Sequence, residues 1–211
     1  RTPHGPLLAA LAALWLAGRV ALLFSASPWA AAIDIAFLPI SAFLFVRVLV
    51  RAGSKRNYAI GGILSALGLA NLMFHLAVAG VVALDPLSVL LAALALIVLL
   101  ETTVAGRVVP MFTANALRGV RQWRNKSFDY ATLGATALAL ALWVGVGGTL
   151  AALVALIAAA MQFVRSFGWN PWATRRTPIL WILHVSHLWI PIGLLLIAAV
   201  EWGWVARTAA V

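Results

Sequence analysis

Histidines in apolar segments are the first candidates for chemistry in this chain, because a buried imidazole can bind a metal or move a proton. One of them, His75, ends a stripe of small and polar residues that shares one face of a predicted helix. The stripe consists of Gly61, Ser65, Gly68, Asn71 and His75. Because small residues let a neighbouring helix or a flat cofactor approach closely, His75 is a candidate haem or copper ligand, with Asn71 in a supporting role. The alternative is a hydrogen bond from His75 across a helix interface.

A second candidate site is the pair His184 and His187, which are one helical turn apart and therefore share a helix face. Two imidazoles at this spacing can share one metal or bind one ligand each, and copper, iron and zinc all accept imidazole donors. Pro191 leaves the carbonyl of His187 without its usual helix hydrogen bond. The alternative is one buried, hydrogen-bonded histidine and one that reaches toward the headgroups. We predict a ligand role for at least one of the two.

The stretch from Glu101 to Thr113 contains three further candidates. Glu101 lies in an apolar segment, so we expect it to be protonated, paired with an arginine or part of a proton path. Arg107 either anchors the end of this segment or binds a haem propionate, since guanidinium binds carboxylate in a bidentate manner. Met111 can offer a soft sulfur to copper(I), although a single Met more often packs.

These residues lie in a chain whose composition is that of a membrane protein. Of its 211 residues, 64% are hydrophobic and 9% are charged, and the mean hydropathy is +1.05. A soluble domain is nearer half apolar and a quarter charged, so soluble enzymes and disordered tails are excluded. There is no cysteine, which excludes disulfides, thiolate metal sites and covalently attached haem. The net charge of +10 comes from lysines and arginines between the apolar runs, which indicates membrane topology and not binding to nucleic acid.

Seven apolar segments must position the candidates. They cover about residues 7–24, 30–50, 58–82, 87–109, 131–146, 149–165 and 179–200. Most reach the roughly 20 residues that cross a bilayer as a helix, and the shorter fifth and sixth form a tight hairpin at Gly147 and Gly148. Because backbone groups in lipid must be satisfied internally, the sequence predicts an all-α, polytopic transmembrane bundle in a lipid bilayer.

The connections between the segments predict the orientation of the chain. Every second connection is rich in basic residues, and the connections between them have none. The basic residues are Arg47, Arg51, Lys55 and Arg56, then Arg118, Arg121, Arg124 and Lys126, and then Arg165, Arg175 and Arg176. By the positive-inside rule these connections are cytoplasmic. At 1.5 Å per residue, His75 then lies roughly 25 Å from the inner end of its helix and His187 roughly 12 Å, which favours two separate sites.

Five sequence segments together resemble the NnrS family. They are Leu14–Arg19, Arg56–Tyr58, Asn71–His75, Gly106–Leu117 and His184–Pro191, and they occur in the family's order over almost the whole chain. The resemblance implies a bacterial inner-membrane protein of about twelve helices that contains haem b and copper and is associated with the response to nitric oxide and nitrosative stress in denitrifying bacteria. Residues 1–211 would then be one integral membrane domain from the C-terminal part, and the missing N-terminal helices would be its partners.

With this resemblance the first hypothesis is a haem- and copper-binding membrane protein of nitric oxide tolerance, with nitric oxide as a small-molecule ligand. His75, His184 and His187 are its candidate metal ligands, and Arg107 and Asn71 are supporting residues of the cofactor site. The alternative is a transporter or permease-like protein without a redox cofactor, which uses intramembrane histidines and Glu101 as a proton relay. A third reading, a membrane subunit that docks a partner through its basic loops, leaves the stripe ending at His75 unexplained.

Overall fold

The computed structural model describes residues 4–25 and 27–206 and contains only helices and connecting turns within them. The long helices are α1 (Pro6–Phe24), α2 (Pro28–Arg51), α3 (Tyr58–Val78), α4 (Pro86–Ala116), α5 (Lys126–Gly145), α6 (Gly148–Gly168) and α7 (Pro178–Glu201). Two short 3₁₀ helices, η1 (Lys55–Asn57) and η2 (Pro171–Thr174), lie in the connections before α3 and α7. All seven α-helices are long and apolar enough to cross a membrane. The predicted all-α, multi-pass architecture is therefore confirmed.

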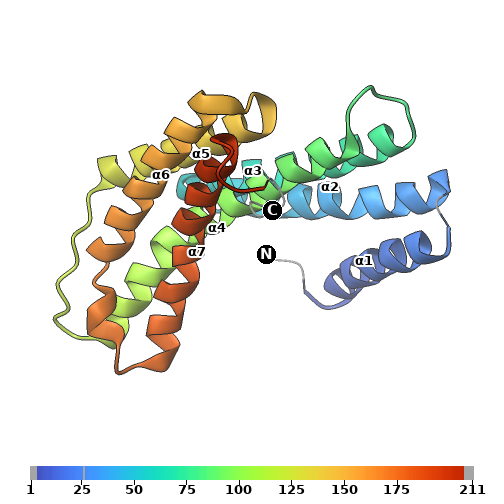
Figure 1. Cartoon of the computed structure of the whole chain (residues 1–211). Coiled ribbons are helices and arrows are strands. Elements are labelled where there is room, and N and C mark those ends of the chain that lie inside the picture. Colours follow the sequence, from blue (N-terminus) through green and yellow to red (C-terminus); the bar gives the residue numbers. More distant parts are fainter. Residues whose placement is uncertain (1–3, 26, 207–211) are drawn as a thin grey trace. The chain divides into compact units, whose positions relative to one another are not determined.

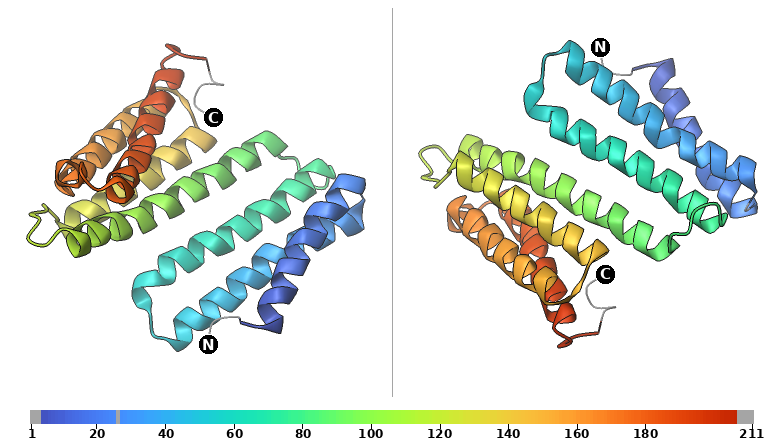
Figure 2. Two further views of the ribbon diagram at one scale, coloured as in Figure 1. Left: turned by 90° about the horizontal axis from the view of Figure 1, so that it is seen from below. Right: turned by 90° about the horizontal axis from the view of Figure 1, so that it is seen from above.

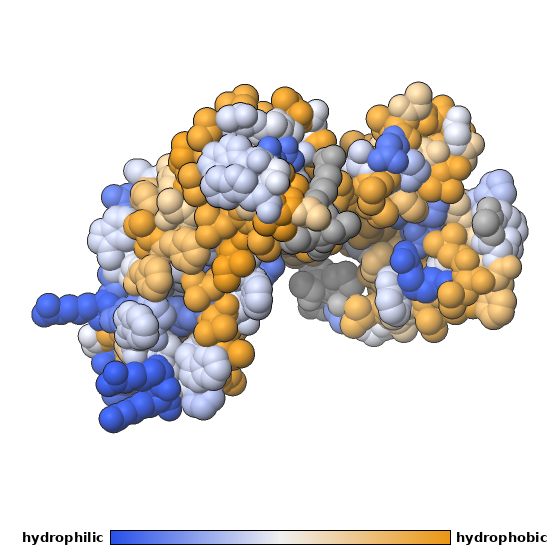
Figure 3. Space-filling view, viewed as in Figure 1, coloured by the Kyte–Doolittle hydropathy of each residue, from blue (hydrophilic) through white to orange (hydrophobic). Residues whose placement is uncertain are grey.

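Large apolar side chains cover much of the outer surface of these helices. Leu23, Phe24 and Trp189 are each more than two thirds exposed. Figure 3 shows apolar residues over most of the visible helix surface, with hydrophilic residues gathered in a few places. In water such a surface would be strongly unfavourable, whereas in lipid it is the expected outer face of a helix bundle.

Three of the predicted helix boundaries differ from the structure by four residues or more. The fourth helix was expected to end at residue 109 but runs through Pro110 to Ala116, because membrane helices tolerate proline where other groups satisfy the freed backbone. The fifth helix begins at Lys126 and not at 131, since the side chain of Asn125 accepts a hydrogen bond from the amide of Phe128 and caps a polar first turn. The third ends at Val78 and not at 82.

The chain divides into two compact units, and the boundary between Leu96 and Ile97 falls within α4. In the first unit α2 packs against both α1 and α3 (Figures 1 and 2). Glycines make these contacts close: a methyl group at Gly18 would lie 3.0 Å from the Cα of Asp34, and one at Gly61 would lie 3.0 Å from the side chain of Val46. The small face of α3 therefore accommodates α2.

In the second unit α6 packs against both α5 and α7 (Figures 1 and 2). The buried face of α6 is rich in alanine, which lets its neighbours approach closely: Ala151, Ala152, Ala155, Ala158 and Ala159. The hairpin between α5 and α6 turns at Gly147 and Gly148, whose φ angles of 70° and 74° suit glycine. The amide of Gly148 donates to Glu201 at the end of α7, so this polar contact ties the hairpin to α7.

Asp85 caps the beginning of α4. Its carboxylate accepts hydrogen bonds from the Ser88 hydroxyl at 2.9 Å and from the Ser88 amide at 3.0 Å. The hydroxyl bond, followed by the amide bond, holds the pKa of Asp85 below its ordinary value. Because the pKa of this carboxyl group is lower in the folded state than in the unfolded state, its ionisation stabilises the fold at pH values above the unfolded-state pKa. This contribution is lost as the pH falls through the folded-state pKa.

We therefore expect Asp85→Ala to lower the thermal unfolding temperature in detergent more at pH 7 than near pH 2. Circular dichroism at the two pH values measures the difference. Asp85→Asn is the matched control, because the amide oxygen still accepts these hydrogen bonds but does not titrate. An equal loss for Asp85→Ala at both pH values would contradict the carboxylate cap.

Candidate functional site

The strongest candidate site in the second unit is centred on His184 and His187 of α7. Their side chains are only 4% and 2% exposed, so neither reaches toward the surface. Both ring nitrogens of His187 are buried without a hydrogen-bond partner, and so is the Nδ1 atom of His184. Because buried polar atoms are nearly always paired, these three nitrogens need a partner that the side chains around them do not supply.

Thr113 of α4 determines which nitrogen of His184 carries the proton. The Thr113 hydroxyl donates to the carbonyl of Val109 at 2.9 Å and lies 2.9 Å from Nε2 of His184. Since the hydroxyl proton is used in the first bond, Nε2 of His184 must be the donor in the second. The Nδ1 atom of His184 is then a lone-pair nitrogen, which is the form that binds a metal.

Trp169, in the connection between α6 and α7, covers both histidines. Its ring centroid lies 4.8 Å from that of His187 and 6.4 Å from that of His184. The indole is 1% exposed and therefore keeps water away from the imidazoles. The guanidinium carbon of Arg165 lies 5.2 Å from the same ring, within the range of a cation–π contact.

Arg165 is part of the site, although the sequence analysis counted it with a basic loop. It lies in α6, is 3% exposed and pairs through Nε with Asp129 of α5 at 2.9 Å. The signal was present in the sequence: Asp129 stands eighteen residues before Gly147 and Arg165 eighteen residues after it, so an antiparallel hairpin at this glycine brings them level. Gly106 of α4 lies directly against the guanidinium, where any side chain would overlap it.

The first unit contains a separate polar cluster around Asp34 of α2, which the sequence analysis missed. Asp34 is 4% exposed and forms an ion pair with Arg19 of α1. Two residues of α3 also contact its carboxylate: Nε2 of His75 lies 3.0 Å from Oδ2, and the amide of Asn71 donates to the same oxygen at 3.3 Å. Three helices therefore converge on one carboxylate inside the predicted span. The small and polar stripe of α3 leads to this cluster.

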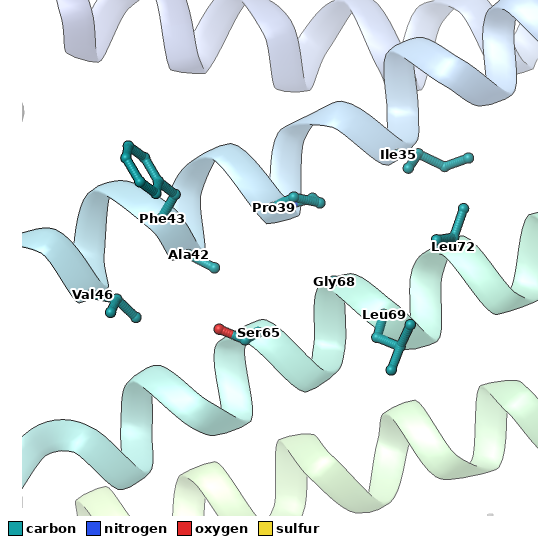
Figure 4. Close-up of a pocket in the computed structure, with 9 residues that line it drawn as sticks. All are labelled: Ile35, Pro39, Ala42, Phe43, Val46, Ser65, Gly68, Leu69 and Leu72. Atoms are coloured by element: carbon teal, nitrogen blue, oxygen red, sulfur yellow. The ribbon is translucent and has the colours of Figure 1, made fainter.

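Next to this cluster, a groove of about 480 Å³ runs between α2 and α3. Figure 4 shows it bounded by Ile35 and Leu72 at one end and by Val46 at the other. Pro39 and Gly68 face each other across its middle, and its walls are apolar except for Ser65. The Ser65 hydroxyl donates to the carbonyl of Gly61 at 2.9 Å, so it offers the groove no free proton.

The remaining candidates lie on the part of α4 that belongs to the second unit. Arg107 is half-buried, Glu101 is exposed and Met111 is 46% exposed. His75 belongs to the first unit, whereas His184, His187 and Arg107 belong to the second. Within residues 4–25 and 27–206, no three His, Asp or Glu side chains lie close enough together to hold a metal ion. The metal-ligand roles of His75, His184 and His187 stay predictions.

The comparisons with known proteins are consistent with the motifs quoted above. No curated protein and no solved structure matched the chain. The family model described as "NnrS protein" matches residues 1–211, which is the full length of the chain. The chain therefore belongs to the NnrS family.

Proposed function

We propose that this protein is a haem- and copper-binding protein of the bacterial inner membrane that acts in the response to nitric oxide and nitrosative stress. The proposal joins the family's implied cofactors to one observation, the three buried and unpartnered imidazole nitrogens of His184 and His187. Imidazole nitrogen is a good donor to iron and to copper, so the donor set fits either group. His187 and His184 would hold it in the second unit.

The surrounding residues have the features of a supporting shell for a metal-binding imidazole. Thr113 fixes the tautomer of His184 and leaves Nδ1 as the lone-pair nitrogen that can bind a metal. Trp169 excludes water from the site, and Arg165 brings positive charge next to the same indole. A bound haem would supply an iron with an open position at which nitric oxide can bind.

His75 has a partner that commonly stands behind a metal-binding histidine. A carboxylate that accepts from one ring nitrogen orients the ring and raises the basicity of the other. Asp34 is placed to do this through Nε2 of His75, and Asn71 holds the carboxylate from the same helix. This supports His75, through Nδ1, as a ligand of the second cofactor, in agreement with the two separate sites expected from its depth.

The test is the cofactor content of full-length protein purified from haem-replete, copper-supplemented cells. We expect a reduced-minus-oxidised spectrum with a b-type haem signal that shifts when nitric oxide is added. His187→Ala or His184→Ala should remove most of the haem or copper, and Thr113→Val should weaken retention about tenfold, as is typical of an outer-shell partner. His4→Ala is the matched control, because His4 is exposed and precedes α1. Wild-type content of both groups in His187→Ala and His184→Ala would reject the proposal.

A second candidate function is a transporter without a redox cofactor, and the Asp34 cluster favours it. Ionisable residues inside a span commonly mark a proton or substrate path, and here Arg19, Asp34 and His75 are in contact. Glu101, the other residue expected in such a relay, is exposed on α4. A flat spectrum from protein purified from haem-replete cells would favour this function over the first.

A further inference from the structure

Arg165 has a buried hydrogen-bond donor without an acceptor. Its Nε donates to Asp129 at 2.9 Å, but its Nη1 is buried and has no partner. A guanidinium group has five N–H donors in a rigid plane, so one carboxylate cannot satisfy all of them. Burying an unpaired donor of a charged group costs more free energy than burying an unpaired donor of a neutral group. The unpaired Nη1 therefore points to an acceptor that binds here.

Arg165 and the charged side chains around it together carry a net positive charge. Arg124 acts on the guanidinium as a second cation, whereas Asp129 is the acidic side chain that pairs with it. His187 also lies within electrostatic range of Arg165, and both contact the indole of Trp169. An anion at Nη1 would therefore balance a local excess of positive charge next to the indole that His187 also contacts.

We infer that Arg165 is an anion-binding residue whose Nη1 receives a carboxylate or a similar planar oxyanion beside His187. The missing side chain at Gly106 lets the guanidinium lie against α4, so the position of the donor is fixed from three sides by Gly106, Asp129 and Trp169. The anion has two sources, a carboxylate of a haem held by the histidines or a free carboxylate. The first source rests on the proposed function and the second does not.

The first arm of the test measures haem retention in full-length protein after gel filtration. For a haem carboxylate we expect Arg165→Gln to retain about tenfold less haem than wild type, because a lost charge-assisted hydrogen bond is worth a factor of this order. Arg165→Lys should retain an amount of haem between those of Arg165→Gln and wild type, since the lysine ammonium keeps the charge but not the planar pair of donors. Arg176→Gln is the matched control, because Arg176 is an exposed arginine in the connection before α7.

The second arm uses sodium formate, with sodium chloride at equal ionic strength as its control. For a free carboxylate we expect formate to raise the unfolding temperature of the wild type by about 2–4 °C and to leave Arg165→Gln unchanged. If haem supplies the carboxylate, formate should act on haem-free protein but not on haem-loaded protein.

Either pattern supports the anion site and identifies its source. Two results together would overturn the anion site. They are haem retention in Arg165→Gln equal to that of wild type, and no change in the unfolding temperature of haem-free wild type when formate is added. Should Arg165→Gln fail to fold, the double variant Asp129→Asn/Arg165→Gln removes the charge pair as a whole and takes its place in both arms. A wild-type protein without haem would reject the proposed function alone, and the formate arm would still decide the role of Arg165.

Discussion

Gly106→Ala is expected to lower the free energy of unfolding by about 3 kcal/mol, the range for breaking a buried ion pair. The new methyl group would overlap the guanidinium of Arg165, whose end must then move. A flexible arginine on the surface would move at little cost. Arg165 is 3% exposed, bonded to Asp129 and in contact with Trp169, so its displacement breaks these contacts.

Unfolding in mixed micelles, followed by tryptophan fluorescence, measures this loss. The matched control is Gly134→Ala in α5, where an added methyl group meets nothing within 4 Å. There we expect no loss, or a gain of up to about 1 kcal/mol, because alanine favours a helix over glycine. If both variants behaved alike, the close contact between Gly106 and Arg165 would not contribute to stability.

The pair of variants also bears on the family signature around Gly106. Read along the sequence, Gly106 and Arg107 suggested a cofactor contact made by the arginine. The structure gives the glycine its own physical role, since it is the surface against which a buried arginine from α6 lies. A motif residue can thus be explained by a side chain about sixty positions away, which no local pattern reveals.

The number and type of the helices could be predicted from the sequence, because the length of an apolar run is fixed by the thickness of the bilayer. Two helix ends were predicted wrongly because charge and proline were treated as boundaries. Pro110 lies inside α4, and the first turn of α5 is polar from Lys126 onward. Both errors arose because hydropathy reports what faces lipid, whereas a helix continues as long as its backbone bonds are satisfied.

The candidate site was predicted in part. The spacing of His184 and His187 placed both on one face, and both are buried there. Asp34 was missed because it was counted as part of an apolar run, and Arg165 because it was counted with a basic loop. Neither was examined as an isolated charge in a span. Pairs such as Asp34 with His75 join different helices, and a single sequence contains no direct signal for the contact.

The charge pair in the first unit is expected to respond asymmetrically to the loss of its two members. Arg19→Leu should cost about 2–3 kcal/mol, because it leaves the carboxylate of Asp34 inside the span with only Asn71 and His75 as partners. Asp34→Asn should cost less than about 1 kcal/mol, since Arg19 is 53% exposed and can turn toward water or headgroups.

The double variant Arg19→Leu/Asp34→Asn completes the cycle and is expected to recover most of the loss of Arg19→Leu, because no uncompensated charge remains in the span. Unfolding in mixed micelles again measures each step, and Arg47→Leu, which removes an exposed arginine of α2, is the control for losing a positive charge. Additive losses in the double variant would mean that the two charges do not interact. Recovery would show that Asp34 is kept charged within the membrane by Arg19, which leaves its second oxygen to orient His75.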